Sequence, residues 1–168
     1  MTTRPIELRD ANAFVSEHHR HSRRVAGHRW SLGLYENDEL VGVMICGRPV
    51  ARMIDQRKTL EVLRVCLSPR APRNANSFLY GKAARIWSEM GGDEILTYTL
   101  EKESGASLRG AGWVAVGTVA HGEWSRPSRK RESQAVYKEP KIKWSRKLAR
   151  WQATTGDATG AGTAKEGI

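Results

Sequence analysis

The stretch TLEVLRVCLSPRAPRNANSFLYGKAARIW, Thr59 to Trp87, decides the fold. Residues 59–67 are mostly apolar with two polar interruptions, which predicts a strand. The loop at 68–77 leads into a segment with helical periodicity. The residues expected on the apolar face of this helix are Leu79, Ala83, Ile86 and Met90. Because the first turn of a helix has N–H groups without partners, a strand followed by such a loop and helix suits a phosphate.

This loop lacks the glycines that usually let a backbone approach a phosphate closely. Asn74 and Asn76 stand in their places, and asparagine tolerates the left-handed region better than other non-glycine residues. We therefore expect the two asparagines to keep the turn. Ser77 can add a hydroxyl, and Arg70 and Arg73 can add charge-assisted hydrogen bonds. The alternative is an ordinary strand-to-helix turn capped by asparagine or serine.

The rest of the chain predicts a mixed α/β fold, a mainly antiparallel central sheet flanked by helices. A helix is expected after Asp10, a favourable N-cap residue, and Gly91 is expected to end the long helix. Further elements are expected at 30–35 and 40–46 (a hairpin), 94–100 (strand), 106–109 (short helix), 114–120 (strand) and 135–144 (a last strand piece). The domain is expected to span 1–144, with a core at about 8–121 and a basic extension at 122–144. Residues 145–168 are expected to form a tail, basic and then disordered.

The positive charge lies mainly outside the centre of the chain. The formal net charge of the 168 residues is +10; residues 31–121 carry eleven basic and ten acidic groups, whereas residues 122–151 carry ten basic and three acidic groups. A basic segment with interleaved aromatic residues predicts DNA as a partner, and a solubilising tail is the alternative. No apolar run is long enough for a membrane span and nothing indicates export, so we expect a cytoplasmic protein without a membrane partner. Cys46 and Cys66 lie in apolar runs and are expected to be reduced core residues.

The order strand, loop, helix, strand, followed by SLRGAGW, resembles the GCN5-related N-acetyltransferase (GNAT) fold over roughly residues 8–121. In that family a loop with the pattern Q/R-x-x-G-x-G/A holds the pyrophosphate of acetyl-CoA, and RAPRNANS can be aligned with it. The resemblance implies acetyl-CoA or another acyl-CoA as cofactor. The residues it places at the cofactor are Val65, Cys66 and Leu67, through backbone N–H groups, and Arg70, Arg73, Asn74, Ala75, Asn76 and Ser77.

Acyl transfer to an amine also needs groups that move protons. In many members of the family an acid at the place of Glu61 acts as the base; the alternative is a carboxylate paired with Arg64 or Arg48. Tyr98 or Ser104 is a candidate donor to the departing thiolate, although Tyr98 also suits core packing. His18 and His21 are candidate bases or substrate contacts. No carboxylate or cysteine accompanies them at ligand spacing, so no metal site is predicted.

A closer resemblance rests on HHRHS, GLYENDELVGVMICGRPVAR, TLEVLRVC, NSFLYGKAAR, TYTLEKESGASLRGAGW and WSRPSR. Together they resemble a phage and prophage group akin to the Mom-type proteins, DNA-adenine modifiers on a GNAT-like fold. The resemblance implies an acyl-CoA-dependent N-acyltransferase that acts on a nucleic acid base. An N-acetyltransferase for a protein or small molecule, and a non-catalytic nucleic-acid-binding protein, are the alternatives. The residues expected at the nucleic acid are Arg48, Arg52, Trp124, Arg126 and Arg129.

Overall fold

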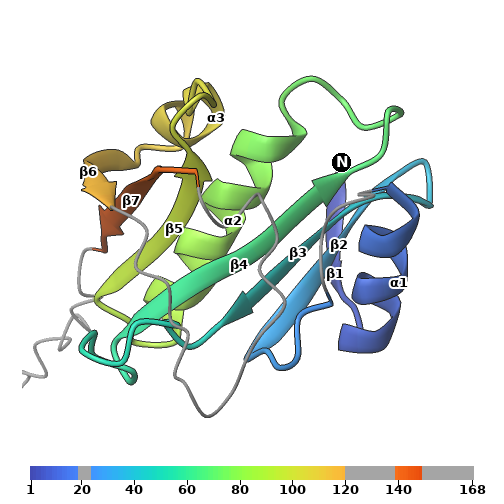
Figure 1. Cartoon of the computed structure of the whole chain (residues 1–168). Coiled ribbons are helices and arrows are strands. Elements are labelled where there is room, and N and C mark those ends of the chain that lie inside the picture. The colour runs from blue at the N-terminus through green and yellow to red at the C-terminus, as the bar shows by residue number, and fades with distance from the viewer. Residues whose placement is uncertain (19–23, 120–138, 149–168) are drawn as a thin grey trace, which may run out of the picture.

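The computed structural model describes residues 1–18, 24–119 and 139–148. In these residues a seven-stranded sheet in the order β1-β2-β3-β4-β5-β7-β6 carries three helices (Figure 1). The elements are β1 (Thr2–Pro5), α1 (Leu8–His18), β2 (Trp30–Glu36), β3 (Glu39–Gly47), β4 (Thr59–Leu67), α2 (Ala75–Glu89), β5 (Glu94–Leu100), α3 (Ala106–Gly110), β6 (Val114–Val119) and β7 (Lys141–Lys147). Only β4 and β5 are parallel neighbours among these strands. The predicted mixed α/β fold with a mainly antiparallel sheet is confirmed.

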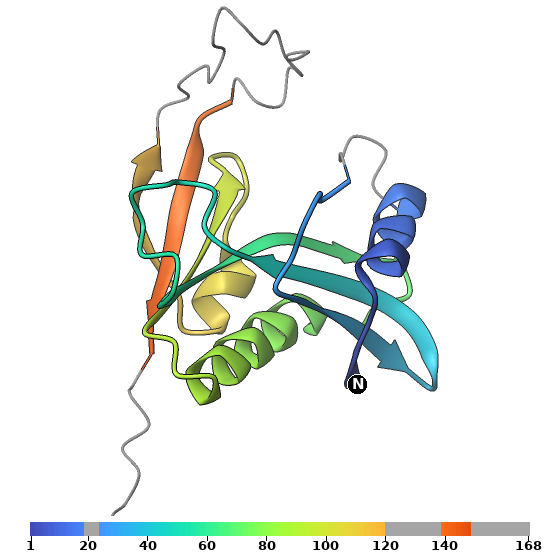
Figure 2. The same cartoon turned by 90° about the horizontal axis from the view of Figure 1, so that it is seen from below.

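Helices cover both faces of the sheet (Figure 2). On one face α2 and α3 pack over the larger core cluster, in which Trp113 and Trp144 are each at most 2% exposed. On the other face α1 packs over a smaller cluster that includes Val43 and Cys66. The loop 48–58, which joins β3 to β4, lies on the α1 side of the sheet (Figure 2). Both cysteines are buried and free, as predicted.

A β-bulge in β4 changes which face its side chains meet. Cys46 of β3 pairs with Val62 and Ile45 pairs with Arg64, so Leu63 is an extra residue in β4. Before the bulge, Val62 packs into the α2 cluster; after it, Cys66 packs into the α1 cluster although both positions are even-numbered. Bulges increase the local twist of a strand, and β4 pairs with β5 only before this point.

The strand that comes last in the sequence, β7, does not lie at an edge of the sheet. β7 lies between β5 and β6 and pairs antiparallel with both. It ends at Lys147, so the sheet reaches past the boundary expected at residue 144. Neither β1 nor the insertion of β7 was among the expected elements. None of the helices in the described ranges is long and apolar enough to cross a membrane.

The predicted helix ends are partly right. The hairpin turn is confirmed, with Asn37 and Asp38 at φ 48° and 62°. Gly91 follows the end of α2 with a φ of 81°, as predicted. Asp10 is not the N-cap of α1, because this helix already begins at Leu8 and Asp10 lies within its first turn. The helix begins before Asp10 because β1 ends at Pro5 and the chain enters α1 directly afterwards. The apolar periodicity, which starts at Ala11, does not indicate this earlier beginning.

The buried face of α2 is also partly as predicted. Leu79 and Ala83 are completely buried, but Met90 lies beyond the helix and is 58% exposed. Trp87 takes the expected place of Met90 in the core, and its indole N–H donates to the carbonyl oxygens of Lys58 and Glu94 at 3.3 and 3.0 Å. An indole fills more of the space between helix and sheet than a methionine, and its polar edge is satisfied there.

Gly105 is expected to be essential for stability. It precedes α3 with a φ of 63°, and a Cβ there would collide with the ring of Trp144. Gly105→Ala should lower the free energy of unfolding by about 2–4 kcal/mol, because it adds backbone strain to a steric clash. Gly81→Ala is the matched control: its Cβ would have nothing within 4 Å inside α2, so it should add about 0.5–1 kcal/mol. Urea unfolding monitored by circular dichroism measures both, and equal effects would contradict this account.

Candidate functional site

The divergence of β4 from β5 has Glu61 at its vertex. Register pairs between these strands run only from Thr59↔Glu94 to Glu61↔Leu96. Glu61 is 6% exposed, and its Oε2 accepts a hydrogen bond of 2.8 Å from the backbone N–H of Val50. Within the described residues it has no ion pair, so pairing with Arg64 or Arg48, the alternative considered above, is not seen. A buried carboxylate with one bonded oxygen retains a second oxygen that can accept a proton.

Burial raises the pKa of Glu61, and the hydrogen bond from Val50 and the charges of Lys141 and Lys143 partly oppose this. A raised pKa brings a carboxylate closer to neutral pH, where it works better as a general base. The two lysines are in β7, and Lys143 is the register partner of Tyr98. Sequence reasoning missed both lysines as site residues, because nothing local in the chain shows that β7 inserts beside β5.

Tyr98 lies on the same face as Glu61. Glu61 is level with Leu96, and Tyr98 is two residues further along β5, where side chains return to the same face. Burial, and secondly the negative charge of Glu61, raise the pKa of Tyr98. Its hydroxyl therefore keeps its proton at neutral pH, which is the state a proton donor requires. The structure thus brings two of the predicted catalytic residues together.

The opposite face of the divergence is closed by packing. The hydroxyl of Thr97 donates to the carbonyl oxygen of Val62 at 2.9 Å, one residue beyond the last paired position of β4. Tyr80 of α2 packs edge-to-face on Trp113, with ring centroids 5.3 Å apart. Burial raises the pKa of Tyr80 far above its ordinary value. The vertex is therefore closely packed on the α2 side, and Glu61 and Tyr98 are on the opposite face.

The start of α2 has backbone N–H groups with no partner. The amide of Ala75 donates to Pro72 at 2.9 Å and that of Phe78 to Asn74 at 3.0 Å. Within the described residues, no backbone or side-chain acceptor meets the amides of Asn76 and Ser77. No acidic residue occupies the first turn. These are the conditions under which a helix N-terminus binds an anion.

The expectation that the asparagines keep a left-handed turn is wrong. Asn74 has φ −95° and ψ 8°, and Asn76 lies inside α2; only Asn37 and Asp38 are non-glycine residues with positive φ in the described ranges. The side chain of Asn74 makes no capping bond; the backbone carbonyl oxygen of Asn74 accepts a hydrogen bond from the Ser77 hydroxyl at 3.0 Å. Ala75 is completely buried in the core cluster. The turn needs no glycine because it never enters the region that glycine favours.

The two arginines of this loop differ. Arg70 forms an ion pair with Glu39, with Nη1 and Oε1 2.6 Å apart, and so points towards the β2–β3 hairpin. Arg73 is exposed and has no hydrogen bond or ion pair within the described part of the chain. Gly110 of α3 lies beside Ser77, so the SLRGAGW segment borders the start of α2. Arg73 is therefore the cation available beside the free amides.

Two further predicted residues are elsewhere. His18 ends α1 and packs on Phe14, with ring centroids 4.3 Å apart; with Ser68 it lines a hollow of about 560 Å³ beyond the end of β4. Ser68 lies seven positions after Glu61, roughly 20 Å along the extended chain. Ser104 comes directly before Gly105, the N-cap of α3, and its Oγ accepts a hydrogen bond from the amide of Ala106 at 3.3 Å. The structure does not bring either residue to Glu61 and Tyr98.

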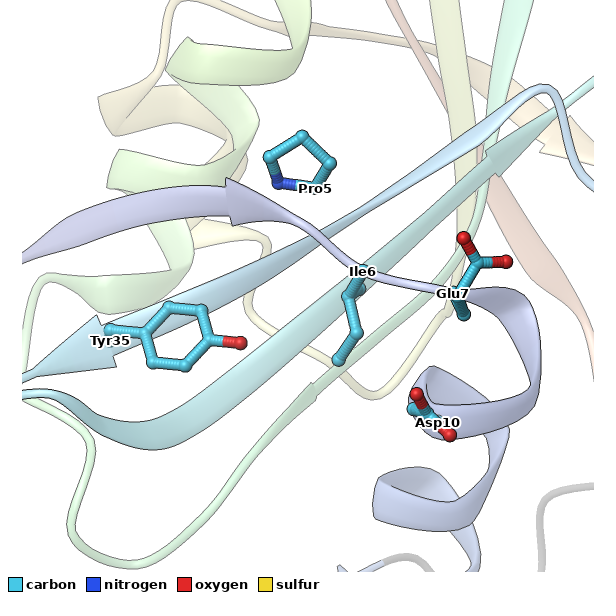
Figure 3. A pocket seen from close by; sticks show the side chains of 5 residues that line it. All are labelled: Pro5, Ile6, Glu7, Asp10 and Tyr35. Carbon is cyan, nitrogen blue, oxygen red and sulfur yellow. The ribbon is translucent and has the colours of Figure 1, made fainter.

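A second hollow of about 330 Å³ lies at the start of α1 (Figure 3). The Tyr35 hydroxyl points towards Ile6, and the carboxyl groups of Glu7 and Asp10 lie at the beginning of the helix. Two carboxylates make this hollow unsuitable for a polyanion. Of the predicted nucleic-acid contacts, Arg48 and Arg52 are exposed on the loop 48–58. His21, Trp124, Arg126 and Arg129 lie outside the described residues.

Comparison with known proteins decides the family. The model of the Mom protein family matches residues 1–145. The chain belongs to the Mom protein family. No curated protein matches this Mom family member in sequence.

Solved structures show the fold of this Mom family member. The ribosomal-protein-S18-alanine N-acetyltransferase of Escherichia coli superposes with a TM-score of 0.63 at 12% identity, over 92% of this chain and 97% of the other. An acetyltransferase of Bacillus subtilis in complex with CoA gives 0.59 at 13% identity, over 88% and 98%. The protein yncA of Salmonella typhimurium, solved with its cofactor acetyl-CoA, gives a TM-score of 0.62 at 16% identity, over 90% of this chain and 96% of the other. The fold is that of the GNAT proteins, as predicted.

The buried Glu61 predicts a specific pH dependence of stability. Its pKa in the folded state is raised above the ordinary 4.5, so folding favours the protonated form. The stability that this preference contributes is present below pH 4.5 and is lost as the pH rises through the folded-state pKa. Glu61→Gln keeps an acceptor for the Val50 amide but cannot ionise. The free energy of unfolding of the variant should therefore gain on that of the wild type as the pH rises from about 4 to 7.

Urea unfolding at several pH values measures this difference. Glu89→Gln, at an exposed position of α2, controls for the loss of a carboxylate. A difference between Glu61→Gln and wild type that stays constant with pH, or that runs in the opposite direction, would contradict a raised pKa.

Proposed function

We propose that the protein is an acyl-CoA-dependent N-acyltransferase that acts on an exocyclic amine of a DNA base, encoded by a phage or prophage. The observation that carries the activity is the buried Glu61 at the divergence of β4 and β5, on the same face as Tyr98. The strand that holds Glu61 leads into the loop before α2, where the first amides of the helix are unpaired. The catalytic domain is proposed to comprise residues 1–144 together with the end of β7.

The described residues fit a CoA pyrophosphate. The free amides of Asn76 and Ser77, the unpaired Arg73 and the absence of acids from the first turn of α2 make an anion site. The backbone of Val65–Leu67 lies beyond the last β4–β5 pair. We assign Arg73, Asn74, Asn76 and Ser77 to the phosphates, whereas the Arg70 side chain is engaged with Glu39. Acyl-CoA, when bound, supplies the acyl group as a thioester.

The protein groups then divide the proton transfers. Glu61 takes the proton from the acceptor amine through its unbonded carboxylate oxygen. Backbone N–H groups of Val65–Leu67 stabilise negative charge that develops on the thioester oxygen. Tyr98, which burial and Glu61 keep protonated, donates a proton to the departing thiolate. Lys141 and Lys143 limit the rise in the Glu61 pKa, so the carboxylate remains ionisable.

The DNA acceptor is supported by three observations. The chain belongs to the Mom protein family, and its resemblance to Mom-type proteins implies adenine modification. Arg48 and Arg52 are exposed on the loop whose Val50 contacts Glu61. The segment 122–151 carries ten basic and three acidic residues, and its described end includes Lys141 and Lys143 on the Glu61 face. Positive charge of this density attracts a phosphate backbone.

Binding of acyl-CoA should be visible as thermal stabilisation. At a concentration about 100 times its Kd, acetyl-CoA should stabilise the protein by about 2.7 kcal/mol and raise the Tm by about 5 °C or more. Arg73→Glu should abolish the shift, because it removes the free cation and adds an anion beside the phosphates. Arg85→Glu, on the exposed side of α2, should keep it. Differential scanning fluorimetry measures the shift, and a wild type unchanged at saturating acetyl-CoA and CoA would exclude the cofactor.

Action on DNA should leave a chemical trace. Expression in a bacterial host, followed by digestion of its DNA to nucleosides and mass spectrometry, should reveal a deoxyadenosine derivative of increased mass. Glu61→Gln should reduce the amount of the modified nucleoside about 100-fold or more, the usual loss of rate when a general base is removed. Nucleosides identical to those of an empty host, together with newly acylated host proteins or small amines, would assign the protein to another acceptor class.

A further inference from the structure

The loop 48–58 ends in an exposed apolar tip. Met53 is 98% exposed and Val50 is 74% exposed, the two highest values among the large apolar side chains of the described residues. The amide of Ile54 donates to Ala51 at 3.2 Å, which closes a turn with Arg52 and Met53 at its centre. A methionine held in water at the tip of a turn contributes nothing to the core.

The loop holds this tip in place by its own hydrogen bonds. The side-chain amide of Gln56 donates to the carbonyl oxygens of Ala51 and Ile54, both at 3.1 Å. The carboxylate of Asp55 accepts from the amides of Arg57 and Lys58 at 2.7 and 3.1 Å. Because the tip is organised before any partner binds, little entropy is lost when the partner arrives.

The same loop is joined to the catalytic carboxylate. Val50, three residues before Met53, donates its backbone N–H to Glu61. The tip and the carboxylate therefore belong to one hydrogen-bonded unit. If the tip enters a partner molecule, the part of the partner that it contacts is therefore close to Glu61.

The loop carries cations on both sides of the tip in sequence. Arg48, Arg52 and Arg57 are exposed, and none has an ion pair within the described residues. Asp55, the only acid of the loop, is occupied by backbone amides. Unpaired arginines around one protruding apolar side chain match a duplex, which offers phosphates outside and an apolar base stack inside.

We propose that Met53 is a wedge that enters the base stack of duplex DNA and holds open the position whose base is brought to Glu61, while Arg48 and Arg52 bind the flanking phosphates. This rests on the proposed action on a DNA base. The amines of a duplex are confined in its stack, so an enzyme that acylates one must first unstack it. Methionine is among the side chains that proteins insert between base steps.

The test is a duplex with 2-aminopurine at several positions, which needs no recognition sequence and no acyl-CoA. Wild-type protein should raise the 2-aminopurine fluorescence, because unstacking relieves its quenching. Met53→Ala should reduce this rise at least about fivefold, with a change in Kd for the duplex, measured by anisotropy, below about threefold. Met53→Leu should retain the rise. Arg52→Ala should weaken binding and reduce the salt slope by about 1.

Met90→Ala, at an exposed methionine beyond the end of α2, is the matched control and should behave as wild type. A bound duplex whose fluorescence does not rise, a rise that Met53→Ala leaves intact, or no duplex binding at all overturns the wedge. So does Met53-dependent binding to phosphatidylglycerol vesicles with no effect on the duplex, which would indicate a membrane contact. If wild type unstacks the duplex through Met53 but no modified nucleoside forms in the host, the wedge stands and the proposed acylation fails.

Discussion

The short parallel pairing between β4 and β5 is the constraint on which the rest of the structure depends. Only three residue pairs join these strands, and the extra residue Leu63 turns β4 away directly afterwards. Parallel strands that separated without support would expose unsatisfied backbone groups. Here the Thr97 hydroxyl satisfies the Val62 carbonyl, while β3 continues to pair with β4 as far as Leu67. β4 and β5 can therefore separate after Glu61 without leaving the carbonyl of Val62 unsatisfied. The unpaired end of β4 leads into the loop before α2.

Placing Glu61 at this vertex determines its chemistry. A carboxylate in the middle of an intact sheet would meet only apolar neighbours, whereas one on the surface would titrate normally. At the vertex, burial raises its pKa, the Val50 amide holds one oxygen, and two lysines of β7 moderate the effect of burial. The insertion of β7 beside β5 therefore has an electrostatic effect as well as completing the sheet. It brings the positive charges of Lys141 and Lys143 close to Glu61, which comes much earlier in the chain.

The sequence predicted what is encoded locally. The hairpin turn at Asn37, the strand 59–67 and the helix after the loop are all decided by neighbours within a few residues, and each is found. Glu61 and Tyr98 were named as separate candidates through the family resemblance, whereas their position on one face follows from the strand register and was not predicted. The positions of Lys141 and Lys143 could not be predicted, because they depend on strand order, which no local pattern records. The position of His18 could not be predicted either, because a histidine-rich segment says nothing about which end of the sheet it reaches.

The backbone of the loop before α2 has a consequence for the history of this family. With Asn74 at φ −95° and Ala75 in the core, the loop lies in a conformation open to nearly every amino acid. Its donors are main-chain amides, which substitution does not remove. Such a loop can lose its glycine pattern while its backbone geometry persists. Common ancestry is then visible in the backbone conformation after the sequences have diverged.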